Sequence, residues 1–256
     1  MPYFTQVAGH SATLVHGKKE KMVVIFGYSP QYGYLNEVQE CYLGTREWQI
    51  VETAGFPVKG GYGHTSAYDP LTNLIYVYGG YVSETQITQV LTSRLYSYHP
   101  INREWRLLTS APSARFFHTA VFVSGGLMIV FGGNMHNDTQ HSDGTRCYSA
   151  DTIAYDVTCD SWHQFSMPKE MTDLPRYGHI ATVFEKSMYI YGGFDGQMLS
   201  DMSRYDQGRS SFLLLFIFSY LSYLSYSPSP ILPYPICHVY YVSDRNYDLL
   251  STNDRL

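Results

Sequence analysis

The sequence predicts an all-β protein assembled from four copies of one small sheet. The prediction rests on the composition, on glycine pairs that end apolar runs, and on evenly spaced tryptophans. Of the 256 residues, 45% are hydrophobic, 16% are aromatic and only 15% are charged, and 25 are Tyr. This profile favours β-structure over a coiled coil or disorder, and the length is ample for a core.

Glycine pairs end three apolar runs, LIYVYGG, LMIVFGG and MYIYGG. A fourth run, KMVVIFGY, keeps Gly27 and has Tyr28 in the second place. Because glycine has no Cβ and adopts positive φ readily, such a pair is expected where two sheets approach closely and the chain leaves a strand. The paired glycines are Gly79, Gly80, Gly132, Gly133, Gly192 and Gly193.

A histidine opens an apolar segment upstream of each glycine run, and a tryptophan follows the first three runs downstream. The histidines are His10, His64, His118 and His179, and the tryptophans are Trp48, Trp105 and Trp162. The tryptophans are 57 residues apart. Turn signals such as YDPLTN and HPINRE divide each repeat into four short strands. This organisation is typical of a β-propeller, in which each repeat forms one blade.

A His-led strand, an apolar strand ending in Gly-Gly, and then Tyr and Trp at these offsets resemble the kelch repeat, over residues 9 to about 205. Within the kelch proteins, GGFDGQMLSDM and YDVTCDSWHQFSMP resemble the attractin and attractin-like group. The resemblance implies an extracellular or membrane-anchored glycoprotein whose propeller lies beside EGF-like, CUB and plexin-type modules. It also implies a receptor or adhesion role at the cell surface, and a complete ring of six or seven blades.

The predicted propeller is incomplete, because no tryptophan stands near residue 219 where the spacing requires one. The sequence predicts about three full blades and a partial fourth in residues 1–205, followed by a non-kelch, low-complexity tail in 206–256. The repeats are assigned to residues 9–60, 61–114, 115–175 and 176–205. An unclosed arc exposes apolar surface and strand edges, so self-association through the open blade edges is expected.

The tail contains residues 212–241, a stretch with no charged residue. One interpretation is a membrane anchor, but the apolar run from Phe212 to Leu224 is shorter than the roughly 20 residues of a span. A second interpretation is a degenerate fourth strand followed by an apolar tail. The third, which we favour, is a reading frame that enters a pyrimidine-rich non-coding tract, since nearly all of these residues have codons that start with a pyrimidine. It predicts either a truncated isoform or a gene-model artefact.

The connections between strands 2 and 3 of each repeat are the candidate binding face for a protein partner. They are assigned to residues 28–36, 81–90, 134–150 and 194–200. Aromatic side chains on loops that a rigid scaffold holds are suited to protein recognition, although the rings could instead pack against neighbouring loops. The candidate residues are Tyr28, Tyr32, Tyr34, Tyr81, His136 and Phe194.

The four repeat histidines could be metal ligands, but each occupies the same place in its own blade and they lie apart around the ring. We therefore expect them to form structural hydrogen bonds within their loops. The segment HNDTQHSD could bind a divalent ion through His136, Asp138, His141 and Asp143, or could be a solvated polar loop. We expect the solvated loop, and therefore neither a metal nor a cofactor.

The cysteines do not indicate a disulfide framework. Cys147 and Cys159 flank the third strand of their repeat at opposite ends, too far apart for Cα atoms that must approach within about 7 Å. The pairing of these two, and of Cys41 and Cys237, stays open. Asn137, in the sequon Asn-Asp-Thr, is the glycosylation candidate and fits a secreted setting.

The net charge of -5 and the lack of a basic run make nucleic acid an unlikely partner. No catalytic motif occurs in a suitable context, so no enzyme is expected. The N-terminus has no basic segment followed by an apolar one, so no signal peptide is expected in this chain. Contact with a membrane is expected only through parent domains outside the chain or, less well supported, through residues 212–224.

The predicted function is a non-catalytic protein-binding module, as a fragment or truncated isoform of an extracellular attractin-like glycoprotein. The alternatives are a cytosolic kelch adaptor and, less well supported, a propeller enzyme with a metal centre of the galactose-oxidase kind.

Overall fold

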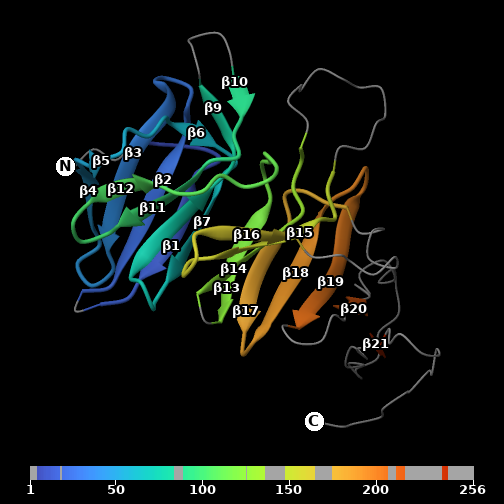
Figure 1. Ribbon diagram of the computed structural model, residues 1–256. Helices are drawn as coiled ribbons and strands as arrows, with labels where there is room; N and C mark the ends of the chain where they lie inside the picture. Colours follow the sequence, from blue (N-terminus) through green and yellow to red (C-terminus); the bar gives the residue numbers. More distant parts are fainter. Residues whose placement is uncertain are drawn as a thin grey trace, which may run out of the picture.

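The computed structural model describes residues 5–17, 19–83, 89–124, 126–135, 148–164, 175–206, 212–216 and 238–241, and every regular element in these ranges is a β-strand. The strands form four antiparallel blades that follow one another in chain order (Figure 1). This arrangement confirms the prediction of an incomplete β-propeller.

Each blade is a meander in which successive strands pair with their neighbours. Blade 1 comprises β1 (Ser11–Val15), β2 (Lys21–Ser29), β3 (Gly33–Tyr42) and β4 (Glu47–Val51). Blade 2 comprises β7 (Thr65–Asp69), β8 (Leu74–Tyr78), β11 (Leu95–His99) and β12 (Glu104–Leu107), and β5 (Ala54–Gly55) joins β12 in parallel. Blade 3 comprises β13 (Thr119–Ser124), β14 (Leu127–Phe131), β15 (Thr152–Asp156) and β16 (Ser161–Gln164).

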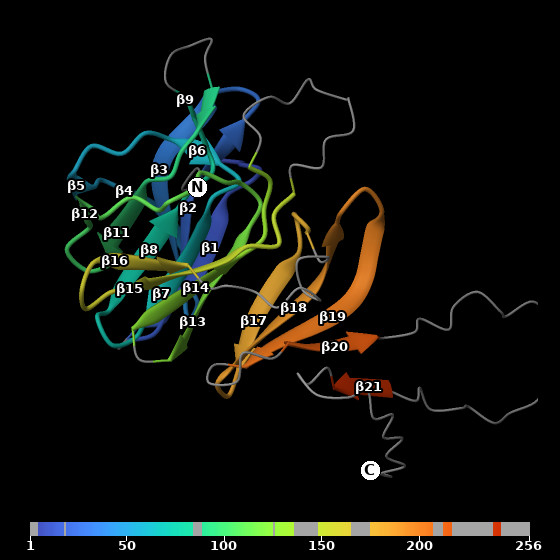
Figure 2. The ribbon, with the colours of Figure 1, turned by 45° about the vertical axis from the view of Figure 1, so that its right-hand side comes forward.

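Blade 4 has a fourth strand, which the sequence assigned to the tail. It comprises β17 (Ile180–Phe184), β18 (Ser187–Phe194), β19 (Met198–Asp206) and β20 (Phe212–Phe216), with β21 (His238–Tyr241) paired beyond β20 (Figure 2). The predicted boundary after residue 205 therefore falls inside this sheet, because strand pairing uses backbone groups and does not need the missing tryptophan. Of the three interpretations, a fourth strand describes residues 212–216. Most of the remaining tail lies outside the described residues.

The blades pack through three apolar clusters, one at each junction. The first strands of neighbouring blades lie together, β1 beside β7, β7 beside β13 and β13 beside β17, so they are the innermost strands of the arc. Trp105 of blade 2 is 1% exposed and packs in the cluster shared with blade 1, and Trp162 of blade 3 packs against the cluster shared with blade 2. These two indoles thus lie between blades. No helix in the described ranges is long and apolar enough to cross a membrane.

In blades 2 and 3, the first glycine of the pair lies directly against the next blade. A Cβ on Gly132 would lie 2.7 Å from both the carbonyl oxygen of Arg176 and the imidazole of His179, in blade 4. Gly79 stands in the same relation to Arg115 and His118 of blade 3. These contacts explain why the strand ends in residues without side chains: the next blade passes directly over them.

The second glycine of each pair instead faces the innermost strand segment of its own blade. A Cβ on Gly133 would lie 2.7 Å from the Cβ of His118, in the same blade, and Gly27 has the same relation to His10. Gly27 is therefore the second glycine of blade 1, one place later than the sequence alignment put it. Phe26 takes the first place, with a left-handed φ of 54°, and stacks on Trp105.

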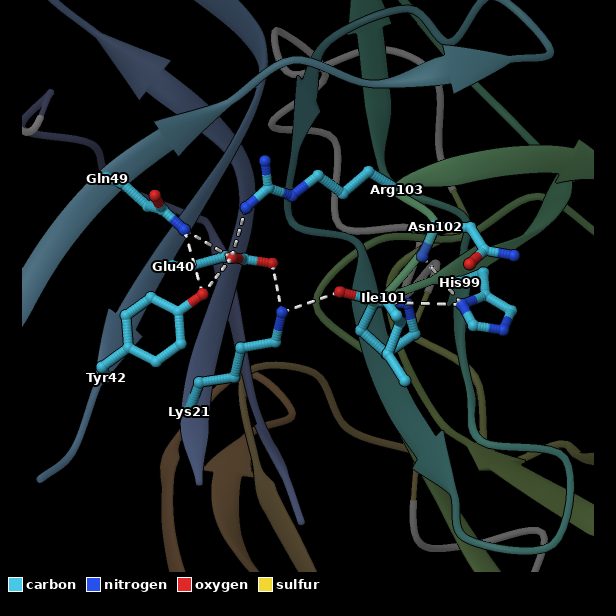
Figure 3. Close-up of polar contacts among 9 residues, drawn as sticks. Lys21, Glu40, Tyr42, Gln49, His99, Ile101, Asn102 and Arg103 are labelled. Carbon is cyan, nitrogen blue, oxygen red and sulfur yellow. Dashed lines mark hydrogen bonds and ion pairs between the residues drawn. The ribbon is translucent and has the colours of Figure 1, made fainter. Parts of the chain in front are cut away.

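A separate polar contact joins blades 1 and 2 (Figure 3). The fully buried carboxylate of Glu40 accepts from Lys21 of β2 and, at 2.9 Å, from Gln49 of β4. Arg103, in the turn before β12 of blade 2, donates to the same carboxylate at 3.3 Å. Lys21 also donates to the carbonyl of Pro100 at 2.7 Å. Glu40 therefore couples its own blade to the next.

Glu40→Gln should lower the free energy of unfolding by about 1–3 kcal/mol, because two cations lose the buried charge that they face. Glu104→Gln is the matched control: Glu104 pairs with Arg106 at 3.6 Å, both side chains are exposed, and a surface pair contributes under about 1 kcal/mol. Denaturant unfolding of both variants checks this, and equal losses would contradict the coupling role of Glu40.

Candidate binding face

A second, smaller layer of pairing lies at one end of every blade. The segment before each repeat histidine pairs with the residue that follows the second glycine. In blade 2 these segments are β6 (Gly61–Tyr62) and β9 (Tyr81–Ser83), with β10 (Gln89–Leu91) beyond. The equivalent pairs are Ala8 with Tyr28, Tyr62 with Tyr81, Phe116 with Asn134, and Tyr177 with Phe194. Backbone pairing thus repeats the same two positions at one end of the arc.

Aromatic rings occupy most of these positions and contact one another from blade to blade. Tyr34 stacks on Tyr62 with ring centres 5.6 Å apart, and Tyr62 stacks on Tyr81 at the same separation. The row continues through Phe116 and Phe117 to blade 4. We call this set the aromatic rim: Tyr28, Tyr34, Tyr62, Tyr81, Phe116, Phe117, Tyr148, Tyr177 and Phe194.

The structure places the predicted site residues differently from one another. Tyr28 and Tyr32 are 39% and 64% exposed, and Tyr34 and Phe194 are half-buried. Tyr81 is only 2% exposed, because Tyr62 and Phe116 cover its ring, so the prediction of an exposed aromatic is wrong there. Tyr32 lies in a turn, as predicted. The other four residues, Tyr28, Tyr34, Tyr81 and Phe194, lie on strands and not in loops.

Phe117 occupies a place that the other repeats give to glycine. Its φ is +50°, whereas Gly9, Gly63 and Gly178, which also precede the repeat histidine, have φ of +63° to +70°. A chain of backbone hydrogen bonds joins the four positions: Gly63 donates to Gly9, Phe117 to Gly63 and Gly178 to Phe117, at 2.7–2.8 Å. A left-handed phenylalanine is strained, and such strain is concentrated at functional sites.

The rim offers flat apolar rings and neutral phenol hydroxyls. Burial raises the pKa of Tyr62 and Tyr177 above the ordinary value near 10, so both stay protonated at physiological pH. Half-buried Tyr and Phe rings on a rigid sheet suit recognition of a partner surface, since they contribute large contact areas at low entropic cost.

The repeat histidines lie between blades. Nε2 of His64, His118 and His179 lies 2.8–2.9 Å from the hydroxyl of Ser11, Thr65 and Thr119 of the preceding blade. Each Nε2 also bonds a carbonyl of that blade, so Nε2 carries the proton. His10, in the first blade, is exposed.

The other candidate residues form no metal site or disulfide in the described ranges. In the described ranges, no group of three or more His, Cys, Asp or Glu residues could hold a metal ion. Cys41 is buried and Cys159 is exposed, and both are free thiols. His136, Asn137, Asp138, His141, Asp143, Cys147 and Cys237 lie outside the described residues.

Sequence reasoning missed five members of the rim and two buried arginines. The signal for the rim is present, since the residues before the histidine are Tyr-Gly, Phe-Phe and Tyr-Gly in three repeats. Arg115 and Arg176, which precede these pairs, are 0% and 2% exposed. Arg115 donates to the carbonyl of Gly132 at 2.8 Å, and Arg176 pairs with Asp201 at 2.8 Å. Through these bonds the two arginines fix the segments that carry the rim residues Phe116, Phe117 and Tyr177 to the strands that end in the glycine pairs.

Comparison with known proteins points to one family. Residues 2–203 match the model of the attractin/LZTR1 β-propeller. The chain is similar to protein tag-53 of Caenorhabditis elegans, at 34% identity over 77% of this chain and 14% of that protein. It is 30% identical to multiple epidermal growth factor-like domains protein 8 of Mus musculus, over 75% of this chain and 7% of that protein. A Rab9 effector protein with kelch motifs from Danio rerio is 26% identical over 76% of this chain and 54% of its own length.

Proposed function

Because the chain belongs to the attractin/LZTR1 β-propeller family, we propose that it is a non-catalytic protein-binding module that contacts its partner through the aromatic rim. The kelch-type propeller is a protein-binding scaffold in general, and the proposal assigns that binding to one face. The observation that carries it is Phe117, a rim residue held in a left-handed conformation at a repeat position where the other three blades have glycine.

The rim also has the composition of a protein-binding surface. Aromatic residues are enriched at the energetic centres of interfaces, where a few rings account for most of the affinity. The rim rings are mutually packed and, apart from the buried Tyr81 and Phe116, partly exposed, so little conformational entropy is lost when a partner covers them. Tyr28 of the rim and Tyr32, in the turn between β2 and β3 of the same blade, are the most exposed of these aromatic residues, at 39% and 64%.

An extracellular setting, as part of an attractin-like glycoprotein, is the location that we propose. The chain spans 14% of protein tag-53 and 7% of multiple epidermal growth factor-like domains protein 8. The name of one of these relatives refers to epidermal growth factor-like domains, which are disulfide-dense modules of secreted proteins. The alternative is a cytosolic kelch adaptor, which the similarity to the Rab9 effector with kelch motifs favours.

Expression of the chain through a secretory pathway tests whether Asn137 is glycosylated. A glycosidase-sensitive increase in mass that Asn137→Gln removes supports the extracellular setting. A soluble, unmodified wild-type chain favours the adaptor.

The rim is tested with Phe117→Gly. Glycine restores the residue of the other repeats and relieves the left-handed strain, so the fold should be kept while the ring is lost. The tagged full chain is applied to intact cells, and to cell lysate for the adaptor alternative, and the bound amount is titrated. We expect at least a tenfold loss of affinity for Phe117→Gly and for Tyr32→Ala. Ile101→Ala, at a 78% exposed position in a turn of blade 2, is the control. Equal affinity of all variants would contradict the proposal.

A further inference from the structure

One face of blade 4 lies open. Ile180 and Phe184 of β17 are 67% and 65% exposed, and Tyr191 of β18 is 42% exposed. The register of β17 and β18 puts Ile180 opposite Tyr191 and Phe184 opposite Ser187, so these side chains share one face of the sheet. The other face, with Met188 and Ile190, packs against blade 3.

The same positions in the other blades are buried under the next blade. Tyr191 corresponds to Ile25, Tyr78 and Phe131, which are at most 2% exposed. Phe184 corresponds to Val15, Asp69 and Val123, which are at most 6% exposed. The open face therefore has the shape and apolar character of a blade-to-blade junction.

Blade 1 presents the complementary face. Leu14 and Ala12 of β1 are exposed, the former at 41%, and they correspond to Val183 and Ala181 of blade 4, which pack against blade 3. His10 is likewise exposed, whereas the three equivalent histidines each insert into the preceding blade. Blade 1 thus presents the histidine and the β1 side chains with which the other blades dock on the one before them.

We propose that blade 4 of one chain docks on blade 1 of a second copy of this chain, through the contact that joins successive blades within the molecule. In this contact, His10 of the second copy packs against blade 4 as His179 packs against blade 3. It donates from Nε2 to the carbonyl of Tyr191, which is equivalent to Phe131. Leu14 and Ala12 cover Phe184 and Ile180. The three junctions inside the chain are the template for this interface, which extends the same packing, and it is separate from the aromatic rim that we propose for other partners.

The contact joins different surfaces of the two copies, so it produces a closed ring or an open-ended assembly. Either has a larger mass than the 29.2 kDa monomer. Ile180→Glu and Phe184→Glu should return the chain to the monomer, because each places a charge in the apolar contact without disturbing the exposed site that it occupies. Ile50→Glu, at a 46% exposed position of β4, should leave the assembly unchanged.

Cysteine cross-linking tests the register of the contact. Within the chain, the hydroxyls of Thr13 and Ser66 are hydrogen-bonded across the first junction. Their equivalents across the proposed contact are Thr182 of blade 4 and Ala12 of the second copy. In a background with the native cysteines replaced, Ala12→Cys chains are mixed with Thr182→Cys chains and oxidised mildly. Thr13→Cys/Ser66→Cys in one chain is the positive control, and Ile101→Cys mixed with Thr182→Cys is the control for random collision.

We expect the 12–182 pair to give a disulfide-linked heterodimer at least tenfold faster than the 101–182 pair. Analytical ultracentrifugation of the full wild-type chain should show assemblies that the two Glu variants abolish. A wild-type chain that stays monomeric at all concentrations would overturn the proposal. That result is expected if blade 4 docks only on a blade of a different polypeptide. Cross-linking no faster than in the collision control would also overturn the proposal.

Discussion

Gly132→Ala should lower the free energy of unfolding by about 2–5 kcal/mol. The φ of Gly132 is +66°, where an L-residue costs about 1–2 kcal/mol. The added methyl group would also lie 2.7 Å from the carbonyl oxygen of Arg176 in the next blade, and relieving such an overlap costs roughly a further 1–3 kcal/mol. Urea or guanidinium unfolding of the wild type and the variant measures the difference.

Gly178→Ala is the matched control, since Gly178 has the same φ of +66° and no atom within 4 Å of the added Cβ. Its substitution isolates the backbone cost, which we expect to be about 1–2 kcal/mol. The excess at Gly132 then measures the close approach of blades 3 and 4. Two variants with equal losses would show that the first glycine serves only the turn and not the junction.

Acid should unfold the propeller through its three buried histidines. Burial lowers the pKa of His64 from near 6.5 to about 4, and burial together with the Arg176 guanidinium lowers the pKa of His179 to about 3. Burial, then Arg115 and the neighbouring histidines, holds the pKa of His118 well below 6.5. In each, Nδ1 is buried and has no hydrogen-bond partner, so a second proton would place an unpaired charge between blades.

The sign of the pH dependence follows from these lowered values. The unfolded chain binds a proton at each histidine near pH 6.5 and the folded chain does not, so the stability is complete above that pH and falls as the pH drops towards 4. His64 alone contributes a loss of roughly 2–4 kcal/mol, and the three together approach the whole stability of an ordinary domain. Denaturant midpoints at pH 7.5, 6 and 5 measure the loss.

His179→Gln keeps a side chain that can donate to the hydroxyl of Thr119 but has no titrating group. This variant should be less stable at pH 7.5 and should show a shallower fall below pH 6.5. A variant with the same pH dependence as the wild type would show that acid acts elsewhere, for instance at the Arg176–Asp201 pair.

The glycine pairs, histidines and tryptophans of the repeats predicted the fold because each has a steric or polar role that recurs from blade to blade. A glycine that another blade crosses and an indole between sheets cannot be exchanged freely, so they are visible in one sequence. The sequence repeats were matched one place wrong in blade 1, where Gly27 was taken as the first glycine of the pair. Phe26 holds that place, because it adopts the left-handed conformation and stacks on Trp105. The fourth strand of blade 4 was one of three interpretations and not the favoured one, because its pairing with β19 needs only backbone groups and no tryptophan marks it.

The candidate site was less predictable because exposure depends on segments far apart in the sequence. Tyr81 follows a glycine pair as Tyr28 does, but Tyr62 and Phe116 cover it, whereas the residue paired with Tyr28 is the small Ala8. The inter-blade role of the histidines likewise depends on hydroxyls 53 to 60 residues away, one repeat earlier. The expectation of loop hydrogen bonds did not include these partners.

The central claim is that His64, His118 and His179 each insert, neutral and with the proton on Nε2, into the blade before their own. Nitrogen-15 NMR of the imidazoles measures this directly. At pH 5.5, we predict that His64, His118 and His179 show the neutral Nε2–H form and a slowly exchanging ring proton in the folded chain. All three rings charged at this pH while the chain is still folded would contradict the account.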